Sequence, residues 1–417
     1  MKFTEFVVTE TAGNSVDPLG YLKPSGEVSS GLFRSFTVLS NHPAYHGFLA
    51  FAFSFLEKMS IKSGQKNFVR RMRDLEILWG VLSVHGGDPV INVTKYEPLT
   101  GQNSLCLDDA KKRPALYARL NYGALGHYVS PSTTWRILQP NGGGLSANGS
   151  ALAEAWQHRN GFDFADLANR WMSGADLFAE KKLGDWARAF RLGAEPEPAE
   201  RKAWQTLIHD LCRREPVIAP LWEKLVTEDI LALGRDEDTY PRFFPGLLGH
   251  YAAHPELCRR IKLCNRFEQL SSLVQFVFEW EYVRRLDHIQ KIGMSANSLP
   301  SQVSNDIRVA AHAFRAVQGL REFWVLPSML ENANDYPTIV ATVLASHSAH
   351  QRAKGASPFI TGDAIAVQDR VDGQKFMQFF KSVADAPETL VSATQWRYHR
   401  NWHFERALLW QRYAGIQ

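Results

Sequence analysis

The sequence predicts a mainly α-helical protein, a multi-helix array with one or two small β-hairpins. Apolar residues recur at three- and four-residue spacings along most of the 417 residues, which is the period of a helix with one buried face. Clusters of Gly, Pro, Asn and Asp flank only a few short hairpin candidates. The composition, 45% hydrophobic and 22% charged residues, is that of a globular protein with packed cores.

The N-terminal part predicts two helices after a turn-rich segment. Gly and Pro recur too often in residues 1–40 for a regular element, so we expect an extended lead-in there. His42–Met59 is apolar almost all round and predicts a buried central helix, with Pro43 in its first turn. Its most apolar run, Phe48–Leu56, is far below the ~20 residues of a membrane span, so we expect no membrane partner. A second helix is expected at Gln65–Val84.

Cations gather on this second helix and on the next one. The next helix is expected from Asp108 or Asp109 to about Leu125, with Pro114 as a potential interruption. Cations on a helix that runs into a hairpin suit the phosphates and base edges of DNA, and the alternative is a solvated helix face. The residues predicted to contact nucleic acid are Lys66, Arg70, Arg71, Lys111, Lys112, Arg119 and Arg136.

The stretch Leu120–Trp156 resembles the closing half of a winged helix. Alternating residues predict a strand at Thr133–Gln139, and the turn residues Pro140–Gly144 predict a loop after it. A helix is expected to follow at Ser146–Ala155. The run Leu145-Ser146-x-x-Gly149-x-x-Leu152-Ala153 is similar to the segment where the wing of such a domain returns into a helix. The fold expected for the N-terminal part is therefore winged-helix-like.

The remainder of the chain predicts helices, a linker and a second hairpin. Pro196 and Pro198 in Gly193–Ala199 predict a linker, and Thr361-Gly362-Asp363 predicts the turn of a small hairpin. The domains expected are residues 1–160 with the winged-helix-like segment, a connector at 161–195, a helical array at 196–335 and C-terminal helices at 336–417. Helices are expected at about 241–253, 256–290, 300–319, 320–332, 336–354 and 394–414.

The sequence predicts no catalytic residue, no metal site and no cofactor. His347 and His350 lie one turn apart on a helix, but zinc needs at least one more ligand, and none has a known spacing. The aromatic and basic helix at 394–414 is suited to stacking on bases, and the alternative is that its Trp residues are buried and its Arg residues solvated. The formal net charge is only +4, so a nucleic-acid hypothesis rests on local clusters of cations.

The cysteines indicate a reducing compartment. They have no Cys-x-x-Cys spacing, and the chain begins without a basic-then-apolar leader. We therefore expect a cytoplasmic protein. The four cysteines are Cys106, Cys212, Cys258 and Cys264.

Four motifs follow one another in an order that resembles the order found in a protein family. Asp17-Pro18-Leu19-Gly20 precedes a Phe36–Phe48 segment, the Leu145–Ala153 motif follows, and His350-x-x-x-Lys354-Gly355 precedes the second hairpin. In this order of motifs, the chain resembles largely uncharacterised helical proteins encoded in bacterial phage-defence gene clusters. The resemblance implies an accessory or sensor subunit that works beside an ATPase or a nuclease, and it carries over no catalytic residue.

Three hypotheses of function follow. The first is a non-enzymatic subunit of a bacterial anti-phage or anti-plasmid defence complex, which binds duplex DNA through the cations above and a protein partner such as an ATPase or nuclease. The second is a divergent metal-dependent nuclease with unassigned ligands. The third is a protein-interaction scaffold whose Trp- and Phe-rich helices bind a partner.

Overall fold

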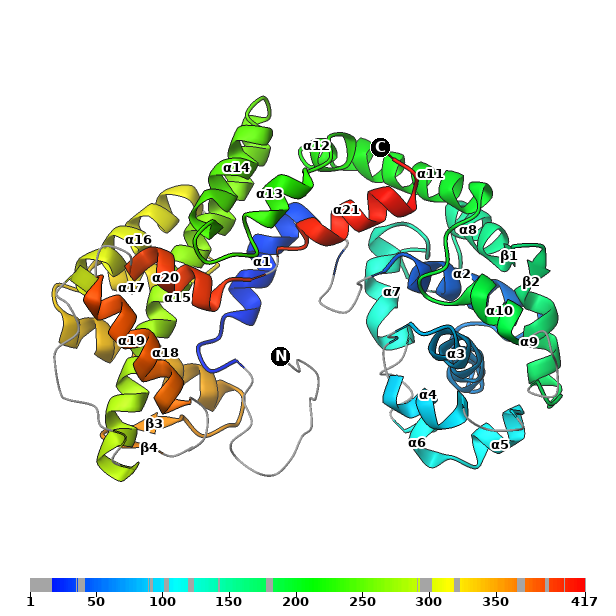
Figure 1. The fold of residues 1–417 in the computed structure, drawn as a ribbon, viewed down its shortest axis with the longest axis horizontal. Helices are drawn as coiled ribbons and strands as arrows, with labels where there is room; N and C mark the ends of the chain where they lie inside the picture. The colour runs from blue at the N-terminus through cyan, green and yellow to red at the C-terminus, as the bar shows by residue number, and fades with distance from the viewer. Residues whose placement is uncertain are drawn as a thin grey trace. The chain divides into compact units, whose positions relative to one another are not determined.

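In the computed structural model, the chain forms two compact units (Figure 1). Unit 1 contains residues up to Leu32 and Val226–Trp402, and unit 2 contains Phe33–Leu225 and the residues from His403 onward. The structure describes residues 17–34, 36, 42–88, 90, 93–100, 105–118, 124–141, 143–177, 183–290, 292, 302–318, 323–365, 372–386, 390–400 and 402–416.

Unit 1 is organised around one long buried helix, α15 (Pro255–Gln290), which is 36 residues long. Buried Leu, Phe and Val side chains recur along it, and α14, α16, α18, α19 and α20 all pack on it. The other elements of unit 1 are α1 (Leu22–Phe33, which ends at the boundary with unit 2), α13 (Glu228–Ala232), the 3-10 helix η2 (Tyr240–Arg242), α14 (Phe243–His250), α16 (Gln302–Gln318), α17 (Leu326–Glu331), α18 (Tyr336–Ala353), β3 (Ile360–Thr361), β4 (Ala364–Ile365), α19 (Gly373–Asp385) and α20 (Leu390–Tyr398).

The prediction of an extended lead-in over residues 1–40 is wrong from Leu22 onward, because α1 begins there. The carboxylate of Asp17 accepts hydrogen bonds from the backbone N–H groups of Tyr21 (2.7 Å) and Leu22 (3.0 Å), so it satisfies donors at the start of this helix. Gly20 has φ +73°, and a Cβ atom there would lie 2.8 Å from the His350 ring. The Asp17–Gly20 motif is therefore a turn that starts α1 against α18.

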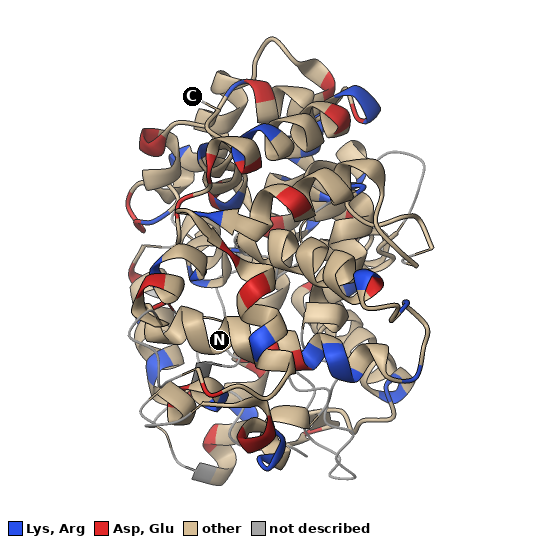
Figure 2. Cartoon of the chain, turned by 90° about the vertical axis from the view of Figure 1, so that its right-hand side faces the viewer, with Lys and Arg blue, Asp and Glu red and all other residues tan. Residues whose placement is uncertain are grey.

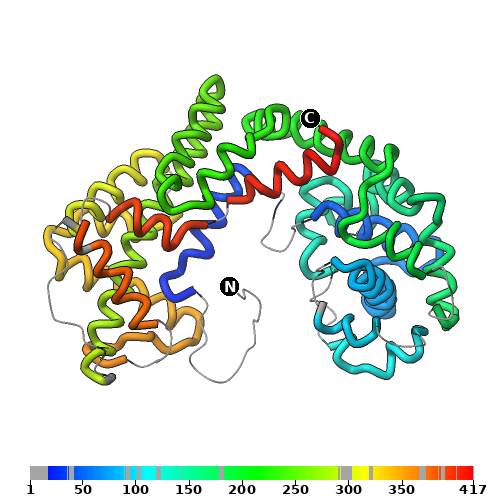
Figure 3. The backbone as a smooth tube through the Cα atoms, viewed as in Figure 1, coloured from blue at the N-terminus to red at the C-terminus, as the bar shows by residue number. Residues whose placement is uncertain are grey.

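Unit 2 surrounds α2 (Ala44–Lys58), which is buried on nearly every side, as its all-round apolar sequence predicts. Helices α3, α7 and α8 pack on it, and Gly47 lies against the ring of Trp156. Figure 3 traces α21 beside α11 and α12 in this unit. The other elements are α3 (Phe68–His85), α4 (Val93–Thr100), α5 (Leu107–Lys111), α6 (Pro114–Tyr117), α7 (Ala124–Thr134), α8 (Ala147–Gln157), β1 (His158–Arg159), β2 (Phe162–Asp163), α9 (Phe164–Met172), α10 (Leu183–Phe190), α11 (Pro198–Arg214), α12 (Ala219–Glu223) and α21 (Phe404–Tyr413).

Two antiparallel hairpins accompany the helices in the described part of the chain. The predicted hairpin is confirmed as β3–β4, with Ile360 opposite Ile365. The hairpin β1–β2, in which Arg159 lies opposite Phe162, was not predicted from the sequence. Asn160 and Gly161 both have positive φ, as a two-residue hairpin turn requires.

Several predicted elements are corrected by the structure. The strand at Thr133–Gln139 is wrong: α7 extends to Thr134, and only an isolated bridge joins Leu138 to Leu145. The helix from Asp108 is interrupted at Pro114 into α5 and α6. The helix at 394–414 is two helices, α20 and α21, and His403 before α21 is left-handed with φ +67°.

The proline-containing segment Gly193–Ala199 packs against unit 2. Ala194 and Pro196 are buried. The Gly193 N–H donates to the Asp88 carboxylate at 2.7 Å, and the Asn160 N–H donates to Glu197 at 3.0 Å. The expected domain boundaries after residues 160, 195 and 335 all lie inside the two units.

Candidate nucleic-acid interface

The turn between α7 and α8 places one arginine in a left-handed conformation. Hydrogen bonds from Trp135 N–H to Pro131 O (2.9 Å) and from Arg136 N–H to Thr133 O (3.0 Å) close the end of α7. Arg136 itself has φ +57°. Positive φ is costly for a residue with a Cβ atom, and glycine is the usual choice at such a helix end.

A close backbone contact holds this turn against α8. A Cβ atom on Gly149 would lie 1.9 Å from the carbonyl oxygen of Ile137, so only glycine fits there. Ser146 caps α8 by accepting from the Gly149 N–H at 3.0 Å, and its hydroxyl donates to the Arg136 carbonyl. The Leu145–Ala153 motif therefore has a structural explanation: a cap, a contact glycine and two core residues.

The base of the loop is buried, and its tip is exposed. Trp135 is fully buried and stacks on Trp410 of the C-terminal helix α21, with ring centroids 4.7 Å apart. Gln139, Pro140 and Asn141 are exposed at the tip. The tip and Arg136 are therefore open to contact with a large partner, whereas Trp135 is not.

Arg136 belongs to a group of three arginines around one carboxylate, which we call the Arg136 cluster: Arg136, Arg213, Arg214 and Asp210. Asp210 accepts from Arg213 at 2.7 Å and from Arg214 at 2.8 Å, and it lies 3.8 Å from Arg136. The side chains of Arg136 and Arg213 are 57% and 71% exposed, whereas that of Arg214 is 20% exposed. Three arginines and one carboxylate give a formal charge of +2.

The electrostatics of Asp210 agree with an excess of cations. Burial alone raises its pKa, but hydrogen bonds from Arg213 and Arg214 and the charges of Arg214 and Arg136 outweigh burial, so the pKa lies below the ordinary value. The carboxylate is therefore ionised at neutral pH and neutralises one of the three arginines. The other two charges are available to an anion.

Among the other predicted cations, Lys111, Lys112 and Arg71 pair with neighbouring carboxylates. Lys111 pairs with Asp108 (3.0 Å), and Lys112, the residue after α5, pairs with Asp109 (2.7 Å), so these four charges sum to zero. Blue and red segments likewise lie side by side along several helices in Figure 2. Exposed ion pairs of this kind contribute little to the free energy of folding, but they cancel the electric field that would attract a phosphate.

The first predicted cluster lies at the start of α3. Arg71 pairs with Asp74 at 3.2 Å, and the guanidinium of Arg70 lies 5.8 Å from the centre of the Tyr117 ring in α6. Lys66 is exposed just before α3. Arg119 lies outside the described residues. The structure thus brings Arg70 and Arg71 near α6 and gives Arg136 different partners.

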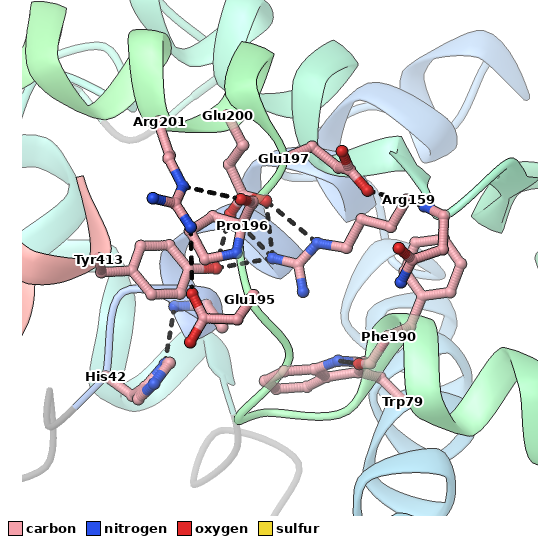
Figure 4. A network of polar contacts seen from close by, with 12 residues as sticks. His42, Trp79, Arg159, Phe190, Glu195, Pro196, Glu197, Glu200, Arg201 and Tyr413 are labelled. Atoms are coloured by element: carbon pink, nitrogen blue, oxygen red, sulfur yellow. Dashed lines mark hydrogen bonds and ion pairs between the residues drawn. The ribbon is translucent and has the colours of Figure 1, made fainter. Parts of the chain in front are cut away.

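A buried ion pair fixes the start of α11, the helix that carries Asp210, Arg213 and Arg214 at its other end (Figure 4). Arg159 of β1 donates to both carboxylate oxygens of Glu200, at 2.7 to 3.0 Å. Tyr413 of α21 accepts from Arg159 at 2.6 Å and donates to Glu200 at 2.7 Å. This contact, the Arg159 network, joins three elements and so orients α11.

Arg213 and Arg214 are the site residues that sequence reasoning missed. They lie more than 70 residues after Arg136, and only the packing of α11 beside the α7–α8 turn brings them together. Arg214 also donates to the carbonyl of Thr134 at 3.2 Å. The only signal in the sequence was a pair of neighbouring arginines at the C-terminal end of a helix. Favourable interaction with the helix dipole already explains such a pair, so it does not by itself indicate a binding site.

Of the two histidines considered as metal ligands, His350 has its Nε2 atom 3.7 Å from the Asp17 carboxylate, and His347 is hydrogen-bonded at both ring nitrogens. The Nδ1 atom of His347 lies 2.7 Å from the Pro18 carbonyl, and its Nε2 atom accepts from the Phe359 N–H at 2.8 Å. Both nitrogens are therefore occupied. Within the described ranges, no three His, Cys, Asp or Glu side chains are grouped so that they could hold a metal ion.

Comparison of the chain with protein-family models, with curated proteins and with solved structures gave no match. In the part of the chain that is described, none of the helices combines the length and the apolar character needed to span a membrane.

Proposed function

We propose that this chain binds duplex DNA through the Arg136 cluster and the exposed tip of the α7–α8 loop, which acts as a wing-like contact surface. The observation that carries the proposal is the left-handed arginine beside Arg213 and Arg214, with one carboxylate among three guanidinium groups. Strained backbone is concentrated at functional sites, so this outlier favours a use for the Arg136 side chain.

The chemistry of the cluster fits phosphate. Guanidinium groups donate paired hydrogen bonds to phosphate oxygens. The two exposed arginines, Arg136 and Arg213, can reach a DNA backbone while the buried base of the loop stays in place. Release of counterions from DNA supplies most of the free energy of such contacts. The one carboxylate of this cluster, Asp210, is engaged by Arg213 and Arg214, which favours binding over metal-dependent cleavage.

We further propose that the chain is a non-enzymatic subunit of a bacterial anti-phage or anti-plasmid defence complex, beside an ATPase or nuclease. This part of the proposal depends on the resemblance of the Asp17–Gly20, Leu145–Ala153 and His350–Gly355 motifs to proteins of defence clusters. Affinity purification of the tagged chain from its native host tests it. Stable co-elution of the product of a neighbouring gene is expected, and elution of the chain alone contradicts the proposal.

The test of DNA binding uses the double variant R136G/R213A and a 30-base-pair duplex. Glycine at 136 removes the charge and relieves the left-handed backbone, so the fold is expected to remain as stable or to gain about 1 kcal/mol. Each lost phosphate contact lowers the slope of log K against log[salt] by about 1, so the slope is expected to fall by about 2. Fluorescence anisotropy at a series of salt concentrations measures it.

The matched control is R188A, which removes an exposed arginine from the same unit. Arg188 pairs with Asp185 one turn away on α10, and it is 78% exposed. This variant is expected to leave both affinity and salt slope unchanged. An unchanged slope in R136G/R213A would show that the Arg136 cluster does not contact DNA, and cleavage of the duplex in Mg²⁺ or Mn²⁺ would favour the nuclease hypothesis instead.

A further inference from the structure

Helix α20 packs on α15 and on η2, and its fully buried side chains are mostly polar. Its buried residues are Leu390, Thr394 and Gln395, of which only Leu390 is apolar. The neighbouring helix α19 differs, because its Phe376 and Phe380 pack on aromatic rings of α15. Apolar side chains therefore make up a smaller share of the fully buried residues in α20 than in α19.

Two carboxylates of α15 bind the cations of this segment. Glu268 accepts from Arg400 at 3.3 Å, and Arg400 also donates to the Ser271 hydroxyl at 2.8 Å. Glu279 accepts from the Tyr398 hydroxyl at 2.5 Å and lies 3.8 Å from Arg397. Both arginines also lie over rings, Arg400 over those of Tyr21 and Phe267 and Arg397 over that of Phe379, at 4.6 to 5.3 Å.

Because its fully buried side chains are mostly polar, separation of α20 from α15 is expected to require less free energy than separation of an apolar interface. The side chains of Glu268 and Glu279 are 0% and 12% exposed, so both carboxylates lose hydration in the closed state. Burial accordingly raises the pKa of both, against the opposing effect of their cationic and hydroxyl partners. When a buried ion pair separates into water, the recovered hydration offsets much of the lost attraction. Elements with few buried apolar contacts are the ones that open below the free energy of global unfolding.

We propose that residues 390–400, the α20 segment, form a second nucleic-acid-binding element that α15 holds closed, and that its ligand is a single strand. In the closed state the carboxylates of Glu268 and Glu279 occupy the place of phosphates on Arg400 and Arg397. Trp396 and Tyr398 alternate with these cations along the segment, and bases stack on such rings with little preference for sequence. The inference rests on the proposed function only in taking nucleic acid as the ligand.

The test uses the full-length variant E268Q/E279Q and the oligonucleotide dT20. Glutamine keeps the size and the hydrogen-bonding oxygen of each side chain but removes the charge that holds the arginines. Hydrogen exchange of residues 391–398 is expected to rise at least about tenfold, with exchange in α15 unchanged. Affinity for dT20 is expected to rise by about tenfold or more, and this gain is expected to disappear in E268Q/E279Q/R397A/R400A.

E281Q is the matched control. Glu281 is also buried on α15, but its partners are Arg284 and Arg285 of the same helix and Tyr336 of α18, and none belongs to α20. It is expected to change neither the exchange of the α20 segment nor the affinity for dT20. If E268Q/E279Q does not fold, as judged by circular dichroism, E279Q alone is measured in the same way.

Two outcomes would overturn the inference. One is faster exchange of the α20 segment without tighter binding of dT20, and the other is a folded variant whose α20 segment exchanges as slowly as before. Either result leaves the proposed duplex site untouched, because R136G/R213A tests that site with α20 intact. Conversely, an unchanged salt slope in R136G/R213A would contradict the duplex site alone. It would leave standing a gain in dT20 affinity that depends on Arg397 and Arg400.

Discussion

At the scale of single residues, Gly149 is the position where one added methyl group meets backbone. Substitution Gly149→Ala puts a Cβ atom 1.9 Å from the Ile137 carbonyl oxygen, and a backbone atom cannot rotate away as a side chain can. We expect a loss of roughly 1–3 kcal/mol in the free energy of unfolding, the usual range for overpacking, or more. Urea denaturation followed by circular dichroism measures it.

The control for this prediction is Gly184→Ala in α10, also in unit 2. Nothing lies within 4 Å of a Cβ atom added there. Alanine in place of a helical glycine is expected to stabilise by roughly 0.5–1 kcal/mol. If Gly149→Ala is as well tolerated as Gly184→Ala, the α7–α8 turn does not approach α8 as closely as described.

The residue scale also shows why part of the site was hidden in the sequence. Arg136 was a candidate from its place beside the predicted loop, and the structure leaves it exposed. Lys111 and Lys112 are predicted because they lie on a helix that runs into the hairpin, yet their neutralising partners stand three residues before them. That spacing was readable, because side chains three residues apart lie on one face of a helix. The contact between Arg136 and Asp210 was not, because it depends on tertiary packing.

At the scale of elements, the Arg159 network determines how β1, α11 and α21 meet. Arg159 and Glu200 are almost completely buried, so neither charge can be hydrated if the other is removed. Glu200→Leu is therefore expected to cost roughly 3–5 kcal/mol in the free energy of unfolding. The double variant R159M/E200L is expected to cost much less than the sum of the single variants, because it leaves no unpaired charge.

A double-mutant cycle in urea checks this prediction. The single variants R159M and E200L, their combination and the unmodified chain are compared at pH 7, with α11 as the element most affected. Purely additive effects would contradict the prediction, since residues that form one network are expected to couple. Duplex binding by R159M/E200L then reports whether the orientation of α11 matters for Arg213 and Arg214.

Elements were predictable where one signal dominated. Helices α2 and α15 follow long, uninterrupted apolar patterns, and the predicted spans His42–Met59 and 256–290 match them closely. Errors arose where a local feature opposed the pattern. Pro114 separates α5 from α6, and Asp17 starts α1 in a stretch whose glycines suggested turns. At the left-handed His403 the sequence contains no glycine to indicate the break.

At the scale of the whole molecule, sequence composition predicts a domain boundary at Gly193–Ala199, but none of the observed boundaries lies there. The prolines of Gly193–Ala199 stop helix propagation, but the segment is fixed to unit 2 by Asp88 and Asn160. The observed divisions, at Leu32–Phe33, Leu225–Val226 and Trp402–His403, require both ends of the chain to return to distant segments. Such long-range pairing leaves no local trace in composition.

The two units also differ in their buried histidines, which leads to a prediction about pH. Burial is the main cause that lowers the pKa of His46 to about 3, of His42 to about 4 and of His403 to about 3, and all three lie in unit 2. The unfolded value is about 6.5. Because the folded values are depressed, their contribution to stability is complete above pH 6.5 and is lost as the pH falls toward the folded values.

The expected size of the effect is large at pH 5. Each of these histidines then binds a proton in the unfolded chain but not in the folded one, which costs about 2 kcal/mol, or roughly 6 kcal/mol if the three are independent. Glu76 of the same unit opposes the trend, because burial raises its pKa. In unit 1 the raised pKa values of Glu268 and Glu279 likewise oppose those of His347 and His350, which are lowered.

Unit 2 is therefore expected to unfold before unit 1 as the pH is lowered from 7 to 5. Tryptophan fluorescence reports mainly on unit 2, which contains eight of the twelve tryptophans, and hydrogen exchange assigns the transition to segments. The variant H46Q removes one titrating group and is expected to flatten the dependence of stability on pH by about a third. Loss of protection in α15 before α2, or a stability of unit 2 that does not change with pH, would show that these histidines are not held neutral in the folded chain.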